Sequence, residues 1–416
     1  MLHYFTRISA LPLLQLLAIG LLILVVTLGS GWITRLPLSY ALIYLVVGII
    51  LGPNVTGLFD LQLDAKALEY ITEIVVIISV FGCGLKMSRR FRLSEWTTTV
   101  RLIGFLMPIS IIAIACVAHW LLAMSWGAAV LLGAILAPTD PVLASEVQLS
   151  HTEDLNELRF SLTSEGGIND ALAFPFVYFG IYALKDNNWD NWLKQWVAVD
   201  IFWAIAAGIG MGFLVAKALV WLEHQLQRRK ATEEIMLDFV ALSAILLTYS
   251  LTELVNGYGF LAVFVAGLVM QHNYYHTQRN DKRLGQLKFV EQIEKLLEVG
   301  TIVLLGTILT LDPGLNYWGQ ALLIAALLMF VIRPLGAMLA LFGSNVSFTN
   351  RTFISWFGIR GIGSLYYLNY AVGKEIGGGG LIEQITWIGI LTVVFSIVVH
   401  GISSSPLMIW YGKNSS

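Results

Sequence analysis

Three acidic side chains lie within two apolar stretches of the sequence. Asp140 interrupts the segment ILAPTDPVLASEV, and Glu165 and Asp170 belong to the following segment RFSLTSEGGINDALAFPF. A carboxylate inside a bilayer is costly, and it usually marks the path of an ion or a proton. We therefore take the stretch 137–175 as the candidate working site.

The residues around the first carboxylate predict a break in the backbone. Pro138 and Pro141 disrupt the helix around Thr139, which frees backbone carbonyls to face a cation. Asp140 lies between the prolines, where the positive N-terminal end of a half-helix would keep it ionised. A carboxylate that interacts with a helix end also stabilises the structure. A functional and a structural interpretation of Asp140 are therefore equally open.

The second apolar segment carries the predicted exchange site. Glu165 and Asn169 are four residues apart and share one helix face, whereas Asp170 projects about 100° away from Asn169. Gly166 and Gly167 thin the helix here. Removal from water penalises a charged carboxylate, so a proton can compete with a cation at Asp170. The structural alternative is a buried carboxylate that is hydrogen-bonded for packing.

Three further charged residues fall within apolar segments. Arg360 is always charged, and we expect Glu165 as its partner in a buried ion pair that holds two spans together. Arg333, next to Pro334, also needs a carboxylate to neutralise it, but the sequence does not identify one. Glu73 either gates or ligates the ion or lies near an aqueous end, and the two interpretations are equally open.

The composition places these residues in a membrane. Of the 416 residues, 57% are hydrophobic and 12% charged, and the mean hydropathy is +0.75, outside the range of soluble globular domains. We expect membrane lipid as a partner, with no nucleic acid, no soluble domain and no cofactor. Cys83 and Cys116 both fall in apolar segments, so they support neither a disulfide nor a cysteine metal site.

Apolar runs of about twenty residues, bounded by Gly, Pro or charge clusters, predict thirteen membrane spans. They are expected at 11–33, 36–51, 67–85, 100–122, 126–148, 157–184, 193–221, 234–253, 256–272, 295–311, 317–342, 350–373 and 382–410. If the N-terminus is outside, eighteen of the 25 Lys and Arg residues lie on the inner side and five on the outer side. This bias predicts an outside N-terminus and a cytoplasmic C-terminus.

Two interrupted spans occupy matching positions in the two halves of the chain. The fifth span is broken around Asp140, and the twelfth is broken by Gly358, Gly361 and Gly363 around Arg360. These spans run in opposite senses across the predicted membrane, as an inverted repeat requires. Paired broken helices predict a transporter with a binding site near the midplane.

Several of these motifs together resemble the monovalent cation/proton antiporters of the CPA1 type, the NhaP-like Na⁺/H⁺ exchangers. The matching stretches, spread over nearly the whole chain, are FGCGLKM at 81–87, APTDPVLASEV at 137–147, EGGIND at 165–170, YGFLAVFVAGL at 258–268, IRP at 332–334 and WFGIRGIGSLYYL at 356–368. The resemblance implies an all-α polytopic fold of about thirteen transmembrane helices, with inverted repeats and two crossed discontinuous helices. It also implies a homodimer and elevator-like alternating access. Residues 1–416 would form one antiporter domain, with dimerisation and scaffold helices at about 11–85 and 193–311 and core ion-transport helices at about 100–184 and 317–410.

The resemblance also implies residue roles. Asp170 would be the ion-binding carboxylate and Asn169 its stabilising neighbour. The other expected participants are Thr139 and Asp140 in the unwound crossing and at the transported Na⁺, Glu73 as a third-span ligand, Glu165 and Arg360 as the ion pair, and Arg333 and Gly166 as supporting residues. Relatives often carry a serine where this chain has Gly166, which leaves ion affinity and selectivity open. The Asn-Asp pair indicates exchange of one cation for one proton.

We therefore expect a secondary antiporter and not an enzyme. It would exchange Na⁺ for H⁺ in a prokaryotic inner membrane, with Li⁺ or K⁺ left open, and cation and proton would compete for Asp170. One alternative is a K⁺-selective antiporter, and another is a transporter of an organic anion bound at half-helix N-termini. An intramembrane hydrolase that uses paired aspartates, or Ser364 with His400, lacks a supporting motif.

Overall fold

The computed structural model is built from helices. It describes residues 10–33, 38–60, 64–90, 92–144, 147–149, 154, 156–186, 188–228, 236, 238–276, 280–310, 314–374, 376 and 378–414. Within these residues, seven helical stretches are long and apolar enough to cross a membrane, and four shorter apolar helices accompany them. The expected all-α polytopic fold is confirmed. Five basic residues counted in the charge bias lie outside the described residues, namely Arg7, Arg35, Arg229, Lys230 and Arg279.

Helices in the first half of the chain coincide with the first six predicted spans. They are α1 (Ala10–Ile33), α2 (Tyr40–Leu51), α3 (Ala65–Lys86), α4 (Thr97–Arg101), the π-helical η1 (Leu102–Leu106), α5 (Met107–Leu122), α6 (Trp126–Leu136), α7 (Glu157–Leu172) and α8 (Phe174–Lys185). Polar residues begin several of them, because a side-chain oxygen at the N-cap accepts a hydrogen bond from a free backbone N–H. Such caps are Ser39 of α2, Asp64 of α3, Ser125 of α6 and Asn156 of α7.

Helices in the second half coincide with the other seven predicted spans. They are α9 (Trp189–Gln195), the π-helical η3 (Trp196–Trp203), α10 (Ala204–Arg228), α11 (Phe239–Leu254), α12 (Gly259–His276), α13 (Asn280–Ile308), α15 (Trp318–Leu327), the π-helical η5 (Leu328–Ile332), α16 (Arg333–Ala340), α17 (Phe348–Trp356), α18 (Ile362–Gly373) and α19 (Gly379–Asn414). The predicted span 317–342 is thus a run of three helical pieces, and the predicted span 350–373 is two helices separated by a break.

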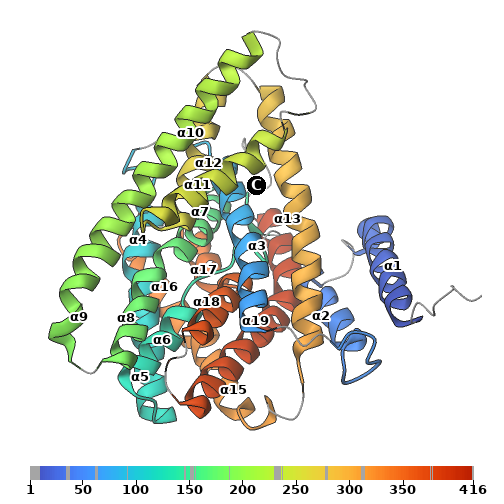
Figure 1. Cartoon of the computed structure of the whole chain (residues 1–416), viewed down its shortest axis with the longest axis vertical. Coiled ribbons are helices and arrows are strands. Elements are labelled where there is room, and N and C mark those ends of the chain that lie inside the picture. The colour runs from blue at the N-terminus through green and yellow to red at the C-terminus, as the bar shows by residue number, and fades with distance from the viewer. Residues whose placement is uncertain are drawn as a thin grey trace, which may run out of the picture.

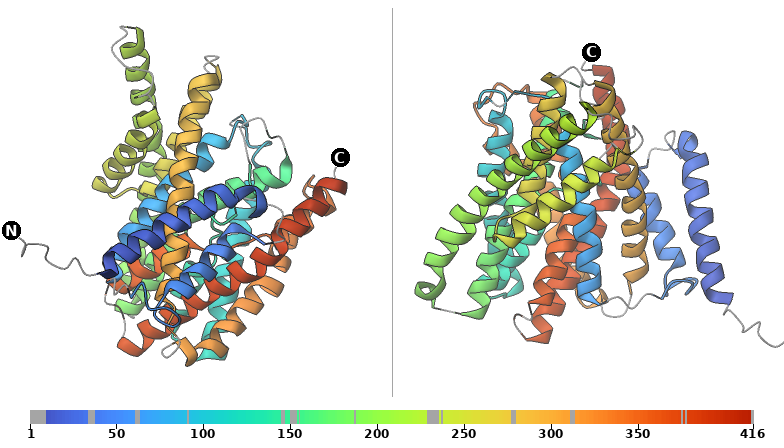
Figure 2. Two further views of the ribbon diagram at one scale, coloured as in Figure 1. Left: turned by 90° about the vertical axis from the view of Figure 1, so that its right-hand side faces the viewer. Right: turned by 45° about the horizontal axis from the view of Figure 1, so that its top comes forward.

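The helices form one bundle with α1 at its edge. Figure 1 and Figure 2 show α1 standing apart from the other helices. The apolar segment Leu11–Gly29 of α1 is 0% buried inside the protein. Such a surface needs an apolar surrounding, which the hydrocarbon of a bilayer supplies.

Candidate functional site

The first predicted break lies directly after α6. This helix ends at Leu136, and residues 137–144 form bends and turns around Thr139 and Asp140. Both side chains are buried. The backbone therefore leaves the helix where Pro138 and Pro141 remove helical donors, as the sequence predicted.

The second predicted break separates α17 from α18. Residues 357–361 are irregular, and α18 begins at Ile362. The two breaks touch, because the main-chain N–H of Asp140 donates to the carbonyl of Ile359 at 2.8 Å. Segments from the two halves of the chain are therefore joined at the point where both leave the helix.

Opposite charges cap the half-helix ends at this crossing. One carboxylate oxygen of Asp140 accepts from the N–H of Gly363 at 3.1 Å, at the start of α18. In return, the Nε of Arg360 donates to the carbonyl of Leu136 at 2.9 Å, at the end of α6. An N-terminal helix end carries partial positive charge and a C-terminal end partial negative charge, so both contacts stabilise the breaks. The expected position of Asp140 at a half-helix N-terminus is confirmed.

The side chain of Arg360 also binds backbone carbonyls that we predicted to face a cation. Its guanidinium donates to the carbonyls of Leu136 and Gly358, and to that of Ala137 at 3.4 Å. These contacts use two of the carbonyls that the proline break leaves unpaired, so these two are not free to face an ion.

The predicted ion pair between Glu165 and Arg360 is wrong. Glu165 on α7 pairs with Arg333 on α16 through two hydrogen bonds, one of them 2.8 Å from Nη2 to Oε2. Nη2 of Arg333 also donates to the carbonyls of Ile354 at 3.0 Å and Phe357 at 2.8 Å. The physical reason is local: Arg360 lies inside a break, where helix-end carbonyls compete for its donors, whereas Arg333 lies on an intact helix beside Glu165.

Asp170 differs from the other carboxylates at the site. Its side chain is 1% exposed, and neither carboxylate oxygen has a hydrogen-bond partner among the described residues. The hydroxyl of Tyr367 on α18 donates to the main-chain oxygen of Asp170. A Cβ added at Gly363 would collide with the Asp170 carboxylate, so the start of α18 lies directly against it.

Asn169 connects Asp170 to the first break. Its amide nitrogen lies 3.4 Å from the hydroxyl of Thr139 and 3.4 Å from a carboxylate oxygen of Glu165. Because the Thr139 hydroxyl and the Glu165 carboxylate both accept here, the end of the Asn169 amide that faces them is assigned as the NH₂ group. The amide oxygen is then left without a partner among the described residues. The structure thus brings Thr139 and Glu165 to the side chain of Asn169, the neighbour of Asp170 in the chain. The roles of these residues toward an ion stay predictions.

Glu73 lies apart from this group. Its carboxylate on α3 accepts a hydrogen bond from the hydroxyl of Tyr249 on α11. Within the described residues, Glu73, Asp140 and Asp170 do not gather into a cluster of metal-ligating side chains. A role for Glu73 as an ion ligand stays a prediction.

Gly166 packs against the first break. A Cβ built on it would lie 3.3 Å from Pro141 and 3.4 Å from the amide nitrogen of Gln148. These separations are tight for a side chain, so glycine at this position lets α7 approach the break closely.

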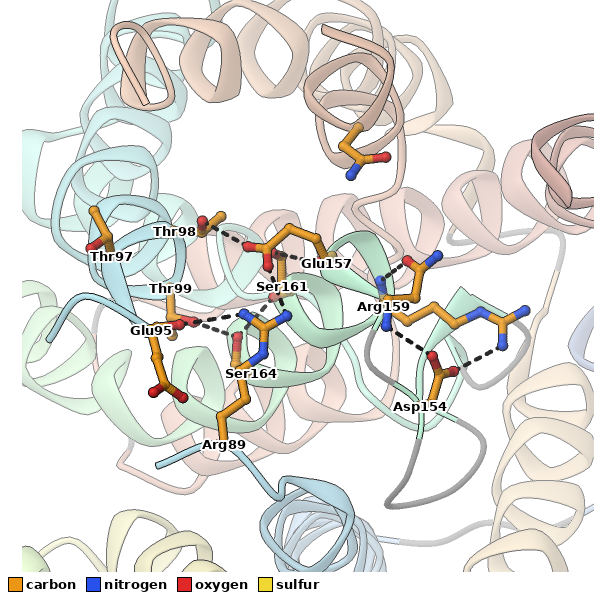
Figure 3. Close-up of polar contacts among 12 residues, drawn as sticks. Arg89, Glu95, Thr97, Thr98, Thr99, Asp154, Glu157, Arg159, Ser161 and Ser164 are labelled. Carbon is orange, nitrogen blue, oxygen red and sulfur yellow. Dashed lines mark hydrogen bonds and ion pairs between the residues drawn. The ribbon is translucent and has the colours of Figure 1, made fainter. Parts of the chain in front are cut away.

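A separate polar network fixes the opposite end of α7 (Figure 3). Glu157, in its first turn, pairs with Arg89 at 2.7 Å and accepts from Thr98 at 3.0 Å. Thr99 and Ser164 share a hydrogen bond of 2.6 Å. These contacts tie α7 to α4 and to the segment that follows α3.

Ser364 and His400 do not form a catalytic pair. The two ring nitrogens of His400 contact Ser396 and the carbonyl of Trp356. Within the described part of the chain, the hydroxyl of Ser364 has no hydrogen-bond partner. The geometry therefore gives no support to a hydrolase.

Known proteins match nearly the whole chain. Residues 20–410 match the family model described as sodium/hydrogen exchanger, transmembrane. The K(+)/H(+) antiporter NhaP of Alkalimonas amylolytica is 24% identical over 405 residues, which are 95% of this chain and 67% of that protein. The K(+)/H(+) antiporter NhaP2 of Shewanella oneidensis is 26% identical over 393 residues, covering 92% and 64%. The Na(+)/H(+) antiporter 2 of Zygosaccharomyces rouxii is 26% identical over 356 residues, covering 80% and 42%. The chain thus spans about two thirds or less of the length of these relatives.

Solved structures show the same fold. The sodium proton antiporter MjNhaP1 from Methanocaldococcus jannaschii, at pH 8, superposes with a TM-score of 0.71 and 22% identity, over 94% of this chain and 96% of that one. An electron-microscopy structure of MjNhaP1 gives a TM-score of 0.73 and 21% identity, over 95% and 97%. The predicted NhaP-like fold and the resemblance to the CPA1 antiporters are confirmed. With a transporter family model matching residues 20–410, the chain belongs to the transmembrane sodium/hydrogen exchanger family.

Proposed function

We propose that this protein exchanges Na⁺ for H⁺ across a membrane, with cation and proton competing for Asp170. The observation that carries the proposal is a difference among the four carboxylates that the sequence singles out for the ion site. Asp140 is held by backbone N–H groups, Glu165 by Arg333 and Glu73 by Tyr249. Asp170 is buried, and its oxygens have no partner among the described residues.

The oxygens at Asp170 suit a small monovalent cation. Besides its two carboxylate oxygens, the amide oxygen of Asn169 is buried and unpartnered in the described structure. Hard cations prefer oxygen ligands, and desolvated oxygens gain most from a cation. When no cation is bound, a proton removes the charge of Asp170, so one carboxylate holds either ion but not both.

Mutual exclusion at Asp170 is enough to couple the two fluxes when the site faces the two sides alternately. We place the alternating movement between core helices at about 100–184 and 317–410 and scaffold helices at about 11–85 and 193–311. The pair Glu165–Arg333 and the contact Asp140–Ile359 lie within the core ranges and join their two parts. Both contacts support one rigid core.

The direct test is cation-induced dequenching of a ΔpH dye in proteoliposomes. Wild type should dissipate ΔpH on addition of cation. Asp170→Asn should lose this response, because a neutral amide can neither take up and release a proton nor balance the charge of a bound cation. The matched control is Asp186→Asn, which changes a half-buried aspartate after α8 in the same way and should retain exchange. Exchange by Asp170→Asn at the wild-type rate would refute the assignment.

A K⁺/H⁺ exchanger is the second candidate. Both bacterial relatives described above are named K(+)/H(+) antiporters, whereas the yeast relative is named a Na(+)/H(+) antiporter. The same assay with Na⁺, Li⁺ and K⁺ at equal concentrations separates the two candidates. A ΔpH that none of the three cations dissipates would favour the organic-anion alternative.

We further propose a homodimer in a prokaryotic inner membrane, with the N-terminus outside and the C-terminus cytoplasmic. The excess of Lys and Arg on the predicted inner side supports the orientation. Labelling of single cysteines introduced near each terminus by a membrane-impermeant reagent in intact cells tests it. Cross-linking in membranes tests the dimer.

A further inference from the structure

The last helix, α19, runs behind the second break and presents two buried polar side chains to it. Ser396 and His400 are four residues apart on one face of α19 and are buried. The proposed exchange reaction assigns neither of them a role. Their contacts reach both ends of the break between α17 and α18.

A chain of hydrogen bonds runs across the break through these two side chains. The main-chain N–H of Arg360 donates to the Oγ of Ser396 at 2.9 Å. This Oγ lies 3.3 Å from the Nδ1 of His400, whose Nε2 lies 3.2 Å from the carbonyl of Trp356. The chain thus begins at the last residue of α17, Trp356, and ends just before α18.

Both ring nitrogens of His400 face main-chain carbonyls. Nε2 lies 3.2 Å from the carbonyl of Trp356, and Nδ1 lies 3.0 Å from the carbonyl of Ser396 and 3.3 Å from its hydroxyl. A carbonyl can only accept and a neutral imidazole carries one proton, so the ring donates to one of the two carbonyls at a time. With the proton on Nε2, His400 donates to Trp356, and Nδ1 accepts from the hydroxyl of Ser396, which in turn accepts from the N–H of Arg360. The chain across the break uses this tautomer.

The broken backbone needs this support. Helical backbone bonds end at Phe357, whose N–H donates to Phe353, and resume at Gly361, whose carbonyl accepts from Leu365. The groups between them need other partners, because an unpaired backbone group inside a membrane costs free energy. A second contact from α19 strengthens the attachment, because the indole N–H of Trp356 donates to the hydroxyl of Ser403 at 3.1 Å. Both ends of the break are therefore fastened to one continuous helix.

The fastened segment is the one that shapes the proposed ion site. Its Ile359 carbonyl accepts from Asp140, its Arg360 side chain caps α6, and Gly363 lies directly against Asp170. A shift of the segment changes all three contacts together.

We propose that His400 and Ser396 are positioning residues for cation and proton exchange, which hold the second break in the geometry that Asp170 requires. This inference rests on the proposed antiport function. Neither side chain contacts the transported ion; both act through Trp356 and the backbone of Arg360.

The test compares substitutions that keep or remove the donor–acceptor pattern. His400→Gln keeps an NH₂ donor for the carbonyl of Trp356 and an oxygen that can pair with the hydroxyl of Ser396. His400→Leu removes both functions, and Ser396→Ala removes the hydroxyl at the centre of the chain. Thr392→Val is the matched control, because Thr392 is buried one turn earlier on α19 and its hydroxyl has no partner within the described residues.

The cation concentration for half-maximal ΔpH dissipation is measured in proteoliposomes, together with its dependence on pH. His400→Leu and Ser396→Ala should raise this concentration about three- to tenfold, the effect of one or two lost hydrogen bonds. His400→Gln should stay within about twofold of wild type, with an unchanged pH profile, and Thr392→Val should match wild type. If His400→Leu does not fold, Ser396→Ala and His400→Gln still decide the question.

Two results would overturn the inference. One is a wild-type half-maximal concentration in Ser396→Ala and His400→Leu. The other is a loss in His400→Gln as large as in His400→Leu, which would assign the effect to the ring and not to the hydrogen-bond chain. Cation-induced thermal stabilisation of the purified protein provides a readout that does not need transport. Failure of the antiport proposal is recognised separately, because wild type itself would then not dissipate ΔpH.

Discussion

Removing both partners of the Glu165–Arg333 ion pair should destabilise the protein less than the sum of the two single removals. Each single removal leaves one buried charge without a partner. Glu165 is 1% and Arg333 is 2% exposed, so neither charge can be solvated when its partner is lost. Breaking a buried pair on one side typically costs about 3–5 kcal/mol. The double variant Glu165→Gln/Arg333→Gln leaves no isolated charge, and we expect a coupling free energy of about 2–3 kcal/mol between the two positions.

The two single variants should not be equal. Arg333 also donates to the carbonyls of Ile354 and Phe357. Arg333→Gln leaves both carbonyls short of a donor, at a further cost of about 1–3 kcal/mol for each one left unpaired. Glu165→Gln keeps these contacts. We therefore expect Arg333→Gln to be the more destabilising of the two changes.

The assay is reversible unfolding in mixed micelles, with tryptophan fluorescence as the probe. The control cycle replaces Arg333→Gln by Arg360→Gln, because Arg360 donates to backbone carbonyls and not to Glu165. Coupling between Glu165 and Arg360 should stay below about 1 kcal/mol. A coupling to Arg360 that equals or exceeds the coupling to Arg333 would refute the ion pair described here.

Three further changes address the surroundings of Asp170. Gly363→Ala should abolish exchange, because its Cβ would collide with the Asp170 carboxylate; wild-type ΔpH dissipation by this variant would contradict the packing. Gly166→Ser should cost about 1–3 kcal/mol in the free energy of unfolding, because its Cβ would lie 3.3 Å from Pro141, and an unchanged stability would show that the break gives way easily. Tyr367→Phe removes the hydrogen bond to the main chain of Asp170 and should destabilise by about 1 kcal/mol, with a raised half-maximal cation concentration; equality with wild type in both measurements would show that this bond is dispensable.

Much of the fold follows from the sequence because a bilayer restricts the choices. Long apolar runs must be helical in lipid, so each predicted span contains a helix or a run of helices. The two breaks were predicted from Pro138 and Pro141 and from the glycines around Arg360, since these residues interrupt helical hydrogen bonding. The pairing of the breaks followed from their matching positions in the two halves.

The choice of partner for Glu165 could not be predicted in the same way. Two arginines were available, and the sequence does not show which backbone carbonyls each can reach. The signal that could have separated them is that Arg360 belongs to a broken segment, where unpaired helix-end carbonyls compete for its donors. The roles of Ser396 and His400 depend on how α19 passes behind the second break, and no local pattern records that contact.

The ion pair also explains how Asn169 takes part in the proposed site. The Glu165 carboxylate that pairs with Arg333 also accepts from the Asn169 amide nitrogen, which lies near the hydroxyl of Thr139 as well. Both acceptors hold the NH₂ group, so that the amide oxygen is left as the free group. A cation gains from that oxygen, whereas a turned amide would offer it a positively polarised NH₂. In the proposed site, the Glu165–Arg333 pair therefore does more than hold helices together, because it fixes the orientation of the Asn169 amide next to Asp170.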